Sequence, residues 1–276
     1  MLVGFNSCVD LKQVHNYAIA SSSNLQNFES LGYSFNNCCI NSSQYQKMQK
    51  RIIESNNTQK PNPCSQEAKL ADSATNLIYN KLKDFFDGIA NLSNNVSVTK
   101  LDTLTGVLSQ AKIGNITITK DQADAYSAIT KTIMDAATNA YRAKKVKQYI
   151  QAAKNPIDTL LDKYNSLLNN LETDLRLNDR AKLHEFYIAE ADSFAAHNNY
   201  AGGMIAARDY YKETQYLDNK MAQIIILRNG VTARKEGYNK ISDNMDRVNR
   251  NEIKTATMQY ASSISNLIIS YNKLKK

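Results

Sequence analysis

Residues 157–175 read IDTLLDKYNSLLNNLETDL, and their apolar side chains recur at alternating steps of four and three. The repeating positions are Ile157, Leu161, Tyr164, Leu168, Leu171 and Leu175. This spacing places one apolar face along an α-helix, and that face must pack against other helices. Asn155 and Pro156 favour a helix start, with Asn155 as the N-cap and Pro156 at the first helical position. We expect this helix to continue to about Ala196.

The same rhythm recurs on the N-terminal side of this stretch. It predicts one helix that begins near Val14 and passes through Phe35, and a second helix over residues 65–92. A short helix is expected over residues 101–108, followed by an extended connection at residues 113–119. These two segments separate the first helices from the rest of the bundle.

A third long helix is expected from Thr119 to about Lys154. Thr119 and Gln122 have the spacing of a capping box, in which each side chain bonds the other residue's backbone N–H. This pair therefore marks the start of the helix.

The C-terminal third continues the helical pattern. A turn is expected at residues 197–203, and helix resumes over residues 204–228. Asn229–Gly230 either ends this helix or kinks it, and an apolar seam then runs over residues 253–274. With 9 Gly and 3 Pro in 276 residues, the chain has few turn residues. The predicted fold is all-α, an elongated antiparallel helical bundle that is coiled-coil-like in places.

The chain has sixteen tyrosines and no tryptophan, and the role of so many tyrosines needs an explanation. A tyrosine stripe can stack on sugars or bases. Several tyrosines instead fall on the apolar seams, and we expect these to pack in the core or at its edge. They are Tyr126, Tyr164, Tyr238, Tyr260 and Tyr271.

The chain is basic, with a formal net charge of +8. The densest basic run is RAKKVK, in which Arg142, Lys144, Lys145 and Lys147 form a candidate basic patch. Such a run is either a solvated helix face or a surface for an anionic partner. No nucleic-acid-binding motif accompanies it, so we expect no nucleic acid partner.

The N-terminus reads MLVGFNSC, and Cys8 is a candidate lipidation site. Apolar and small residues lead into the cysteine as in the tail of a signal peptide, without the basic start. FNSC resembles a bacterial lipobox, whose cysteine is acylated after cleavage. We therefore expect residues 1–7 to be a signal remnant, residues 8–13 a tether, and residues 14–276 a single helical domain.

The overall layout resembles uncharacterised bacterial envelope lipoproteins. The resemblance implies acyl chains such as palmitate on Cys8 and attachment to the cell envelope through this lipid. Val9 after the cysteine, rather than Asp, favours the outer membrane over the inner membrane. The resemblance implies no active site.

The remaining cysteines suggest a disulfide in an oxidising compartment. We expect Cys64 to pair with Cys39, or with Cys38 as the alternative, and the leftover cysteine to be buried and free. The Cα atoms of a bridged pair must lie within about 7 Å. We therefore expect the first helix to end near Cys39, in the polar stretch CINSSQ.

No pattern of catalytic chemistry is present in the sequence. His15, His184 and His197 lack metal-ligand spacing, and Ile188 stands where a zinc motif beginning at His184 needs its second histidine. Walker, dinucleotide-binding and G-x-S-x-G motifs are absent. We expect a protein that is not an enzyme and has no metal or cofactor.

The sequence thus predicts a non-enzymatic, lipid-anchored envelope protein that offers helical surface to a partner protein or an envelope polymer. The alternative is a soluble BAR-like or coiled-coil interaction protein that binds anionic membrane through a basic face. A third hypothesis is a helical pore-forming toxin, but the lack of a long apolar segment argues against it.

Overall fold

The computed structural model describes residues 11–53, 65–94, 110–113, 116–137, 142–244 and 250–275. The predicted all-α helical bundle is confirmed. The helices are α1 Leu11–Gln26, α2 Phe35–Ile53, α3 Ser65–Ser93, α4 Lys120–Ala137, α5 Arg142–Ala152, α6 Lys154–Asp174, α7 Arg180–Ala196, α8 Tyr200–Asn244 and α9 Arg250–Lys273. Two short strands, β1 Ala111–Ile113 and β2 Ile116–Ile118, pair antiparallel at the expected extended connection.

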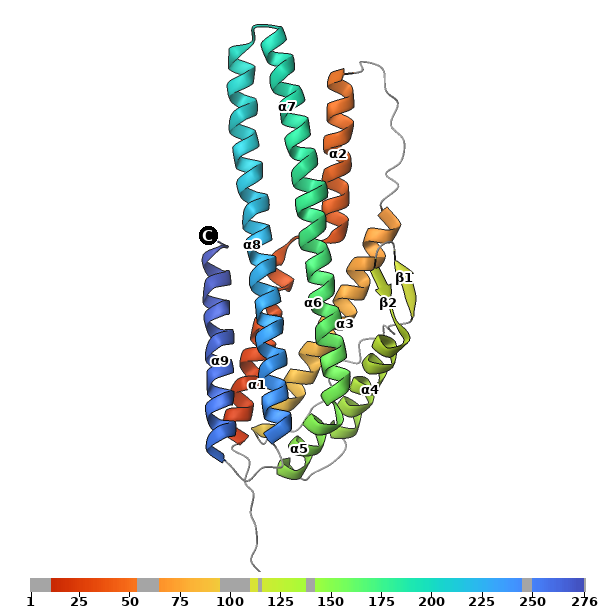
Figure 1. Cartoon of the computed structure of the whole chain (residues 1–276), viewed down its shortest axis with the longest axis vertical. Coiled ribbons are helices and arrows are strands. Elements are labelled where there is room, and N and C mark those ends of the chain that lie inside the picture. The colour runs from red at the N-terminus through yellow and green to blue at the C-terminus, as the bar shows by residue number, and fades with distance from the viewer. Residues whose placement is uncertain are drawn as a thin grey trace, which may run out of the picture.

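The longest helices run along the long axis of the molecule (Figure 1). α6 and α7 follow one another as one rod, and α8 returns beside them over the whole length. α1, α3, α4, α5 and α9 surround the lower half of this pair, whereas α2 packs against α7 in the upper half. The molecule therefore has a many-layered base and a slimmer upper part built from α2, α7 and α8.

The expected continuation of the helix at residues 157–175 to Ala196 is confirmed, with one addition. A π-helical turn, Leu175–Asp179, joins α6 to α7. A π turn holds one residue more than an α turn, so it rotates the helix beyond it. Leu175 and Asp179 are both fully buried, four residues apart, and the buried series continues at Leu183.

The first predicted helix is wrong in its extent, because it is broken well before Cys39. α1 ends at Gln26, a 3₁₀ turn follows at Glu29–Leu31, and Gly32 has a φ of 60°. A left-handed backbone of this kind favours glycine, which explains the break. α1 also begins at Leu11, so residues 11–13 of the predicted tether are helical.

α2 starts anew at Phe35 through contacts that sequence periodicity does not reveal. The carboxylate of Asp72 on α3 accepts hydrogen bonds from the backbone N–H groups of Phe35 (2.9 Å) and Asn36 (3.1 Å). The hydroxyl of Ser34 accepts from the N–H of Asn37 at 3.2 Å. Together these acceptors satisfy the free donors of the first helical turn.

The expected helix end in the stretch CINSSQ is also wrong. α2 runs unbroken from Phe35 to Ile53, through both cysteines and the polar residues after them. The hydroxyl of Ser42 donates to the carbonyl of Cys39 at 3.2 Å, inside the helix. The polar side chains that favoured a turn are thus accommodated within the helix.

The capping box that starts the third helix is confirmed. The N–H of Thr119 donates to the side-chain oxygen of Gln122 (3.1 Å), and the N–H of Gln122 donates to the hydroxyl of Thr119 (3.3 Å). The expected single helix to Lys154 is instead two helices, since α4 ends at Ala137 and α5 begins at Arg142.

Asn155 is not the N-cap of α6. The helix begins at Lys154, and the cap is Ala153, which is fully buried. The backbone of Ala153 (φ −91°, ψ 0°) joins α5 to α6, and its carbonyl accepts from the N–H of Ile157 at 2.8 Å. Burial of this junction in the core therefore decides the start, rather than a polar side-chain cap.

α8 neither ends nor breaks at Gly230, since one helix spans Tyr200–Asn244. A Cβ at Gly230 would collide with the side chain of Asn24 on α1, so the glycine lets the two helices approach closely. One turn later lies Arg234, which is fully buried and donates to the same Asn24 oxygen. Burial lowers the pKa of Arg234 to about 10.

The prediction for the seam tyrosines is confirmed. Tyr126, Tyr164, Tyr238 and Tyr271 are buried, and Tyr260 is partly buried against the core. Within the described ranges, no helix has the length and apolar character needed to cross a membrane.

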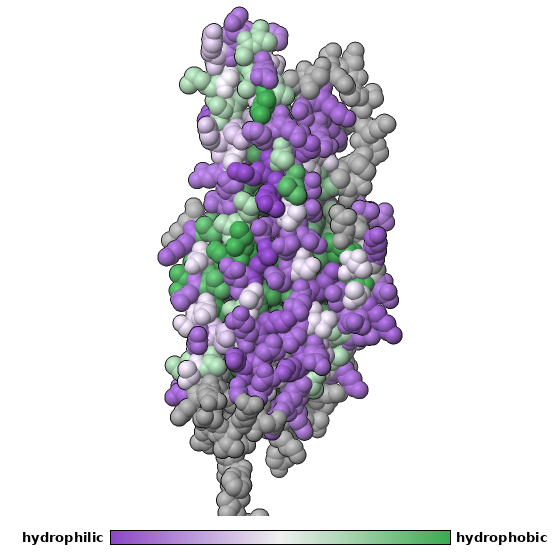
Figure 2. Space-filling model, in the orientation of Figure 1, coloured by the Kyte–Doolittle hydropathy of each residue, from purple (hydrophilic) through white to green (hydrophobic). Residues whose placement is uncertain are grey.

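The visible surface is mostly polar (Figure 2). Apolar side chains gather in small patches, one at the end where α7 turns into α8. The large apolar residues exposed near that turn are Tyr200, Met204, Ile205 and Tyr211.

Candidate functional site

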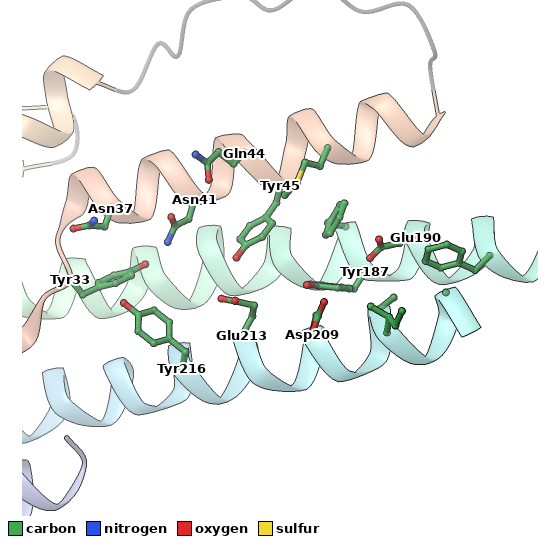
Figure 3. Close-up of a pocket in the computed structure, with 16 residues that line it drawn as sticks. Tyr33, Asn37, Asn41, Gln44, Tyr45, Tyr187, Glu190, Asp209, Glu213 and Tyr216 are labelled. Atoms are coloured by element: carbon green, nitrogen blue, oxygen red, sulfur yellow. The ribbon is translucent and has the colours of Figure 1, made fainter. Parts of the chain in front are cut away.

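A groove of about 640 Å³ lies in the upper part of the molecule, between α2, α7 and α8 (Figure 3). Each helix supplies one wall, and Tyr33, from the segment before α2, lies at the end nearer the base of the molecule. We call this space the α2–α7–α8 groove. Its volume is within the range of small-molecule sites.

Aromatic rings line much of the groove. Tyr45 of α2 stacks on Phe186 of α7 with ring centroids 6.1 Å apart, and Phe186 meets Tyr187 edge to face at 4.9 Å. Tyr216 of α8 lies opposite Tyr33 at the lower end (Figure 3). Stacked rings hold one another in fixed orientations, so the aromatic lining is preorganised.

Three carboxylates face the same groove: Glu190 from α7, and Asp209 and Glu213 from α8 (Figure 3). No lysine, arginine or histidine is among the described residues that line it. Asp209 pairs with its neighbour Arg208 at 3.0 Å, but the Arg208 side chain is 72% exposed. Glu190 and Glu213 form no ion pair with any described residue. The groove therefore carries uncompensated negative charge.

The electrostatics of the groove tyrosines agree with this charge. Burial raises the pKa of Tyr45, Tyr187 and Tyr216, and nearby carboxylates raise each of them further. Glu213 contributes to all three. Burial, followed by the nearby Asp209, raises the pKa of Glu190 above its ordinary value. A negative groove thus lies in a chain whose net charge is +8.

Asp179, in the π-helical turn, holds the lower end of the groove together. One of its oxygens accepts from the Tyr33 hydroxyl (2.6 Å) and from the Asn41 side-chain amide (2.9 Å). The other oxygen has no hydrogen-bond partner, and the residue is fully buried. Burial raises the pKa of Asp179 despite these two hydrogen bonds.

The predicted lipidation site and disulfide are only partly visible. Cys8 and Cys64 lie outside the described residues. Cys38 is buried and free, so it is not the disulfide partner that the alternative pairing proposed. Burial raises the pKa of Cys38 to about 12. Cys39 is not a free thiol, and its pairing with Cys64 stays a prediction.

The candidate basic patch lies on α5, at the base of the molecule (Figure 1). The side chains of Arg142, Lys144 and Lys145 fall outside the described side chains. Lys147 is partly buried and interacts with another residue. The patch and the groove are therefore at different ends of the molecule.

The groove was not predicted from the sequence, although two of its walls have a local signal. FYIAE at residues 186–190 and RDYYKE at residues 208–213 each combine aromatic and acidic residues within two helical turns. The turn predicted at residues 197–203 would have brought these two segments together in an antiparallel hairpin. The contribution of α2, more than 130 residues earlier, had no signal in the sequence.

Comparison with protein-family models, curated proteins and solved structures finds no match to this chain. Among the described residues, no three potential ligands are grouped as a metal site requires. Assignment of a function therefore rests on the groove and on the N-terminal sequence. Tyrosine rings, amides and carboxylates are binding groups, and their arrangement suits recognition of a ligand.

Proposed function

We propose that this chain is a non-enzymatic, lipid-anchored cell-envelope protein that binds a partner through its helical surface. The α2–α7–α8 groove is the binding surface, and the partner is another envelope protein or an envelope polymer. The observation that carries the proposal is the groove itself, with fixed aromatic rings and two half-buried carboxylates, Glu190 and Glu213, that form no ion pair with any described residue.

The position of the groove supports this role. α1 begins at Leu11, three residues after Cys8, at the end of the molecule opposite the α7–α8 turn (Figure 1). A lipid on Cys8 holds the base near the membrane, and the groove then faces away from it. α8 alone, with 45 residues, is about 68 Å long at 1.5 Å per residue.

Anchoring is tested with the chain expressed behind a complete lipoprotein signal in a bacterium. We expect the protein to partition into detergent and Cys8 to carry two or three acyl chains, because one chain anchors only marginally. The Cys8→Ala variant should stay in the aqueous phase. An unmodified Cys8 thiol in the wild-type chain would contradict the anchor.

Binding is tested in the same cells with a photo-crosslinking residue at position 187, inside the groove. The matched control carries it at position 200, where Tyr200 is 80% exposed and outside the groove. We expect a discrete crosslinked product at 187 alone. Equal products at both positions would show that the groove is not the binding surface.

A further inference from the structure

We propose that the α2–α7–α8 groove binds a linear polyamine, a flexible methylene chain that carries several ammonium groups. This inference goes beyond the proposed function: it concerns the same groove, but its ligand is a small cation and not the partner protein or polymer. Three features of the groove support it: the spacing of the carboxylates, the tyrosine rings, and the lack of a positive partner for Glu190 and Glu213 among the described residues.

The carboxylates form a row rather than a cluster. Asp209 and Glu213 are four residues apart on α8, which separates them by about 6 Å along the helix axis. Glu190 lies on α7, on the other side of the groove. Asp209 contributes to its raised pKa, which indicates electrostatic repulsion between the two carboxylates across the groove. A single metal ion needs ligands that converge on one point, whereas this row suits positive charges spaced along a chain.

Tyrosine rings alternate with these carboxylates and can receive both parts of a polyamine. Methylene groups pack on the rings, and ammonium groups lie over ring faces through cation–π attraction. The protein already uses one groove ring in this way, because the ammonium of Lys220 lies 5.3 Å from the ring centroid of Tyr216. Tyr216 therefore already has its cation, and the ammonium groups of a ligand are expected along the row of Glu190, Asp209 and Glu213 rather than over Tyr216.

The charge balance distinguishes a cation from a neutral ligand such as a sugar. A neutral ligand would leave Glu190 and Glu213 half-buried without any positive partner, at a desolvation cost. An ammonium group recovers that cost through charge-assisted hydrogen bonds, which are stronger than neutral ones. The unpaired carboxylates therefore point to a ligand that brings its own positive charge.

The test is isothermal titration calorimetry of the full chain with spermidine at low ionic strength. We expect one spermidine per chain, with affinity that falls as sodium chloride is added. Glu213→Gln and Glu190→Gln should each weaken binding roughly five- to tenfold, as expected for one lost charge-assisted hydrogen bond. Thermal unfolding of each variant checks that it is folded.

The matched control is Asp192→Asn, which removes one exposed carboxylate of α7 outside the groove. It should change the affinity less than twofold. An equal loss in this control would show that spermidine only screens the surface and would overturn the inference. Absence of binding in the wild-type chain, or binding of a trilysine peptide in place of spermidine, would also overturn it.

These results are separable from those for the proposed function. If crosslinks form at position 187 but spermidine does not bind, the groove still serves a partner and the polyamine is wrong. If spermidine binds but Cys8 is not acylated, the ligand assignment stands and the anchor is wrong.

Discussion

Tyr33 and Asp179, 146 residues apart in the sequence, are joined by a hydrogen bond of 2.6 Å that closes the lower end of the groove. The bond connects the segment before α2 to the π-helical turn between α6 and α7. Asn41 of α2 donates to the same carboxylate oxygen. One buried acid therefore fixes the position of α2 relative to α7, and with it the width of the groove.

The buried charge of Asp179 predicts an unusual pH dependence of stability. Burial raises its pKa in the folded state above the unfolded value, so the folded state binds the proton more tightly. The contribution of Asp179 to the free energy of unfolding is therefore present at low pH and is lost as pH rises through the folded-state pKa. Asp179→Asn removes this dependence while keeping an acceptor oxygen for Tyr33.

We expect the stability of Asp179→Asn, relative to the wild type, to increase as the pH rises above about 4, the ordinary pKa of an aspartate. Urea unfolding at several pH values measures it, and Asp192→Asn gives the baseline for removing an exposed carboxylate. A relative stability that decreases over this range would contradict the assignment of a raised pKa.

Asp72 predicts a helix-capping effect across two helices. Asp72→Ala removes the acceptor for the backbone N–H groups of Phe35 and Asn36. We expect a loss of about 1 kcal/mol in the free energy of unfolding, as for other N-cap substitutions. Ser73→Ala, next to it, removes an exposed hydroxyl bonded within α3 and should change stability by a few tenths of a kcal/mol. Equal effects in urea unfolding would show that Asp72 does not cap α2.

Gly230 and Gly203 predict opposite effects of the same substitution in one helix. Gly230→Ala places a methyl group against Asn24, so we expect destabilisation of about 2 kcal/mol from overpacking. Gly203→Ala meets its nearest neighbour, Phe194, at 4.0 Å and should stabilise α8 by about 0.5–1 kcal/mol. Thermal unfolding compares the two. Stabilisation by Gly230→Ala would contradict the close packing of α1 on α8.

The hydrogen bonds of Asp72 place α2 beside α3, and this placement bears on the predicted disulfide. These bonds place Phe35 level with Asp72 on the neighbouring helix, and α2 and α3 run in opposite directions (Figure 1). Cys39 lies about 6 Å beyond Phe35, and Ser65 about 10 Å beyond Asp72 in the same direction. Ser65 is the residue that follows Cys64 in the sequence, so an unbroken α2 is compatible with a Cys39–Cys64 bridge.

We expect the Cys39–Cys64 pair in a non-reducing peptide map of the protein when it is produced in an oxidising compartment. Cys38 should react with alkylating reagents only after unfolding, because it is buried and its pKa is raised. The bridge closes a loop of roughly 25 residues and should contribute about 3 kcal/mol, which reduction removes. Alkylation of Cys39 and Cys64 without reduction would rule the bridge out.

Sequence periodicity predicted the helices but could not predict how they pack. The three–four spacing around Tyr164 and the Thr119–Gln122 box depend on residues within one or two turns, and both are confirmed. The break at Gly32 interrupts a spacing that continues across it, because Leu31 and Phe35 are buried on both sides. Periodicity reports which residues are buried, and it is insensitive to a change of chain direction between them.

The groove shows the same limit. Glu190 and Glu213 are ordinary polar positions on their own helices, and only the antiparallel return of α8 brings them to one space. The π turn that joins α6 to α7 holds an extra residue, which is not marked by glycine or proline. Nothing local in the sequence distinguishes such a turn from regular helix.

The number of residues in the two long helical segments, α6–α7 and α8, also sets the length of the molecule. α6, the π turn and α7 continue without a break from Lys154 to Ala196, and α8 matches them on the return. Matched insertions of seven residues in α7 and α8 would each add two turns and raise the tip by about 10 Å without changing which faces meet. The length of these helical segments therefore sets the distance between the base and the α7–α8 turn. This distance can increase or decrease while the base stays unchanged.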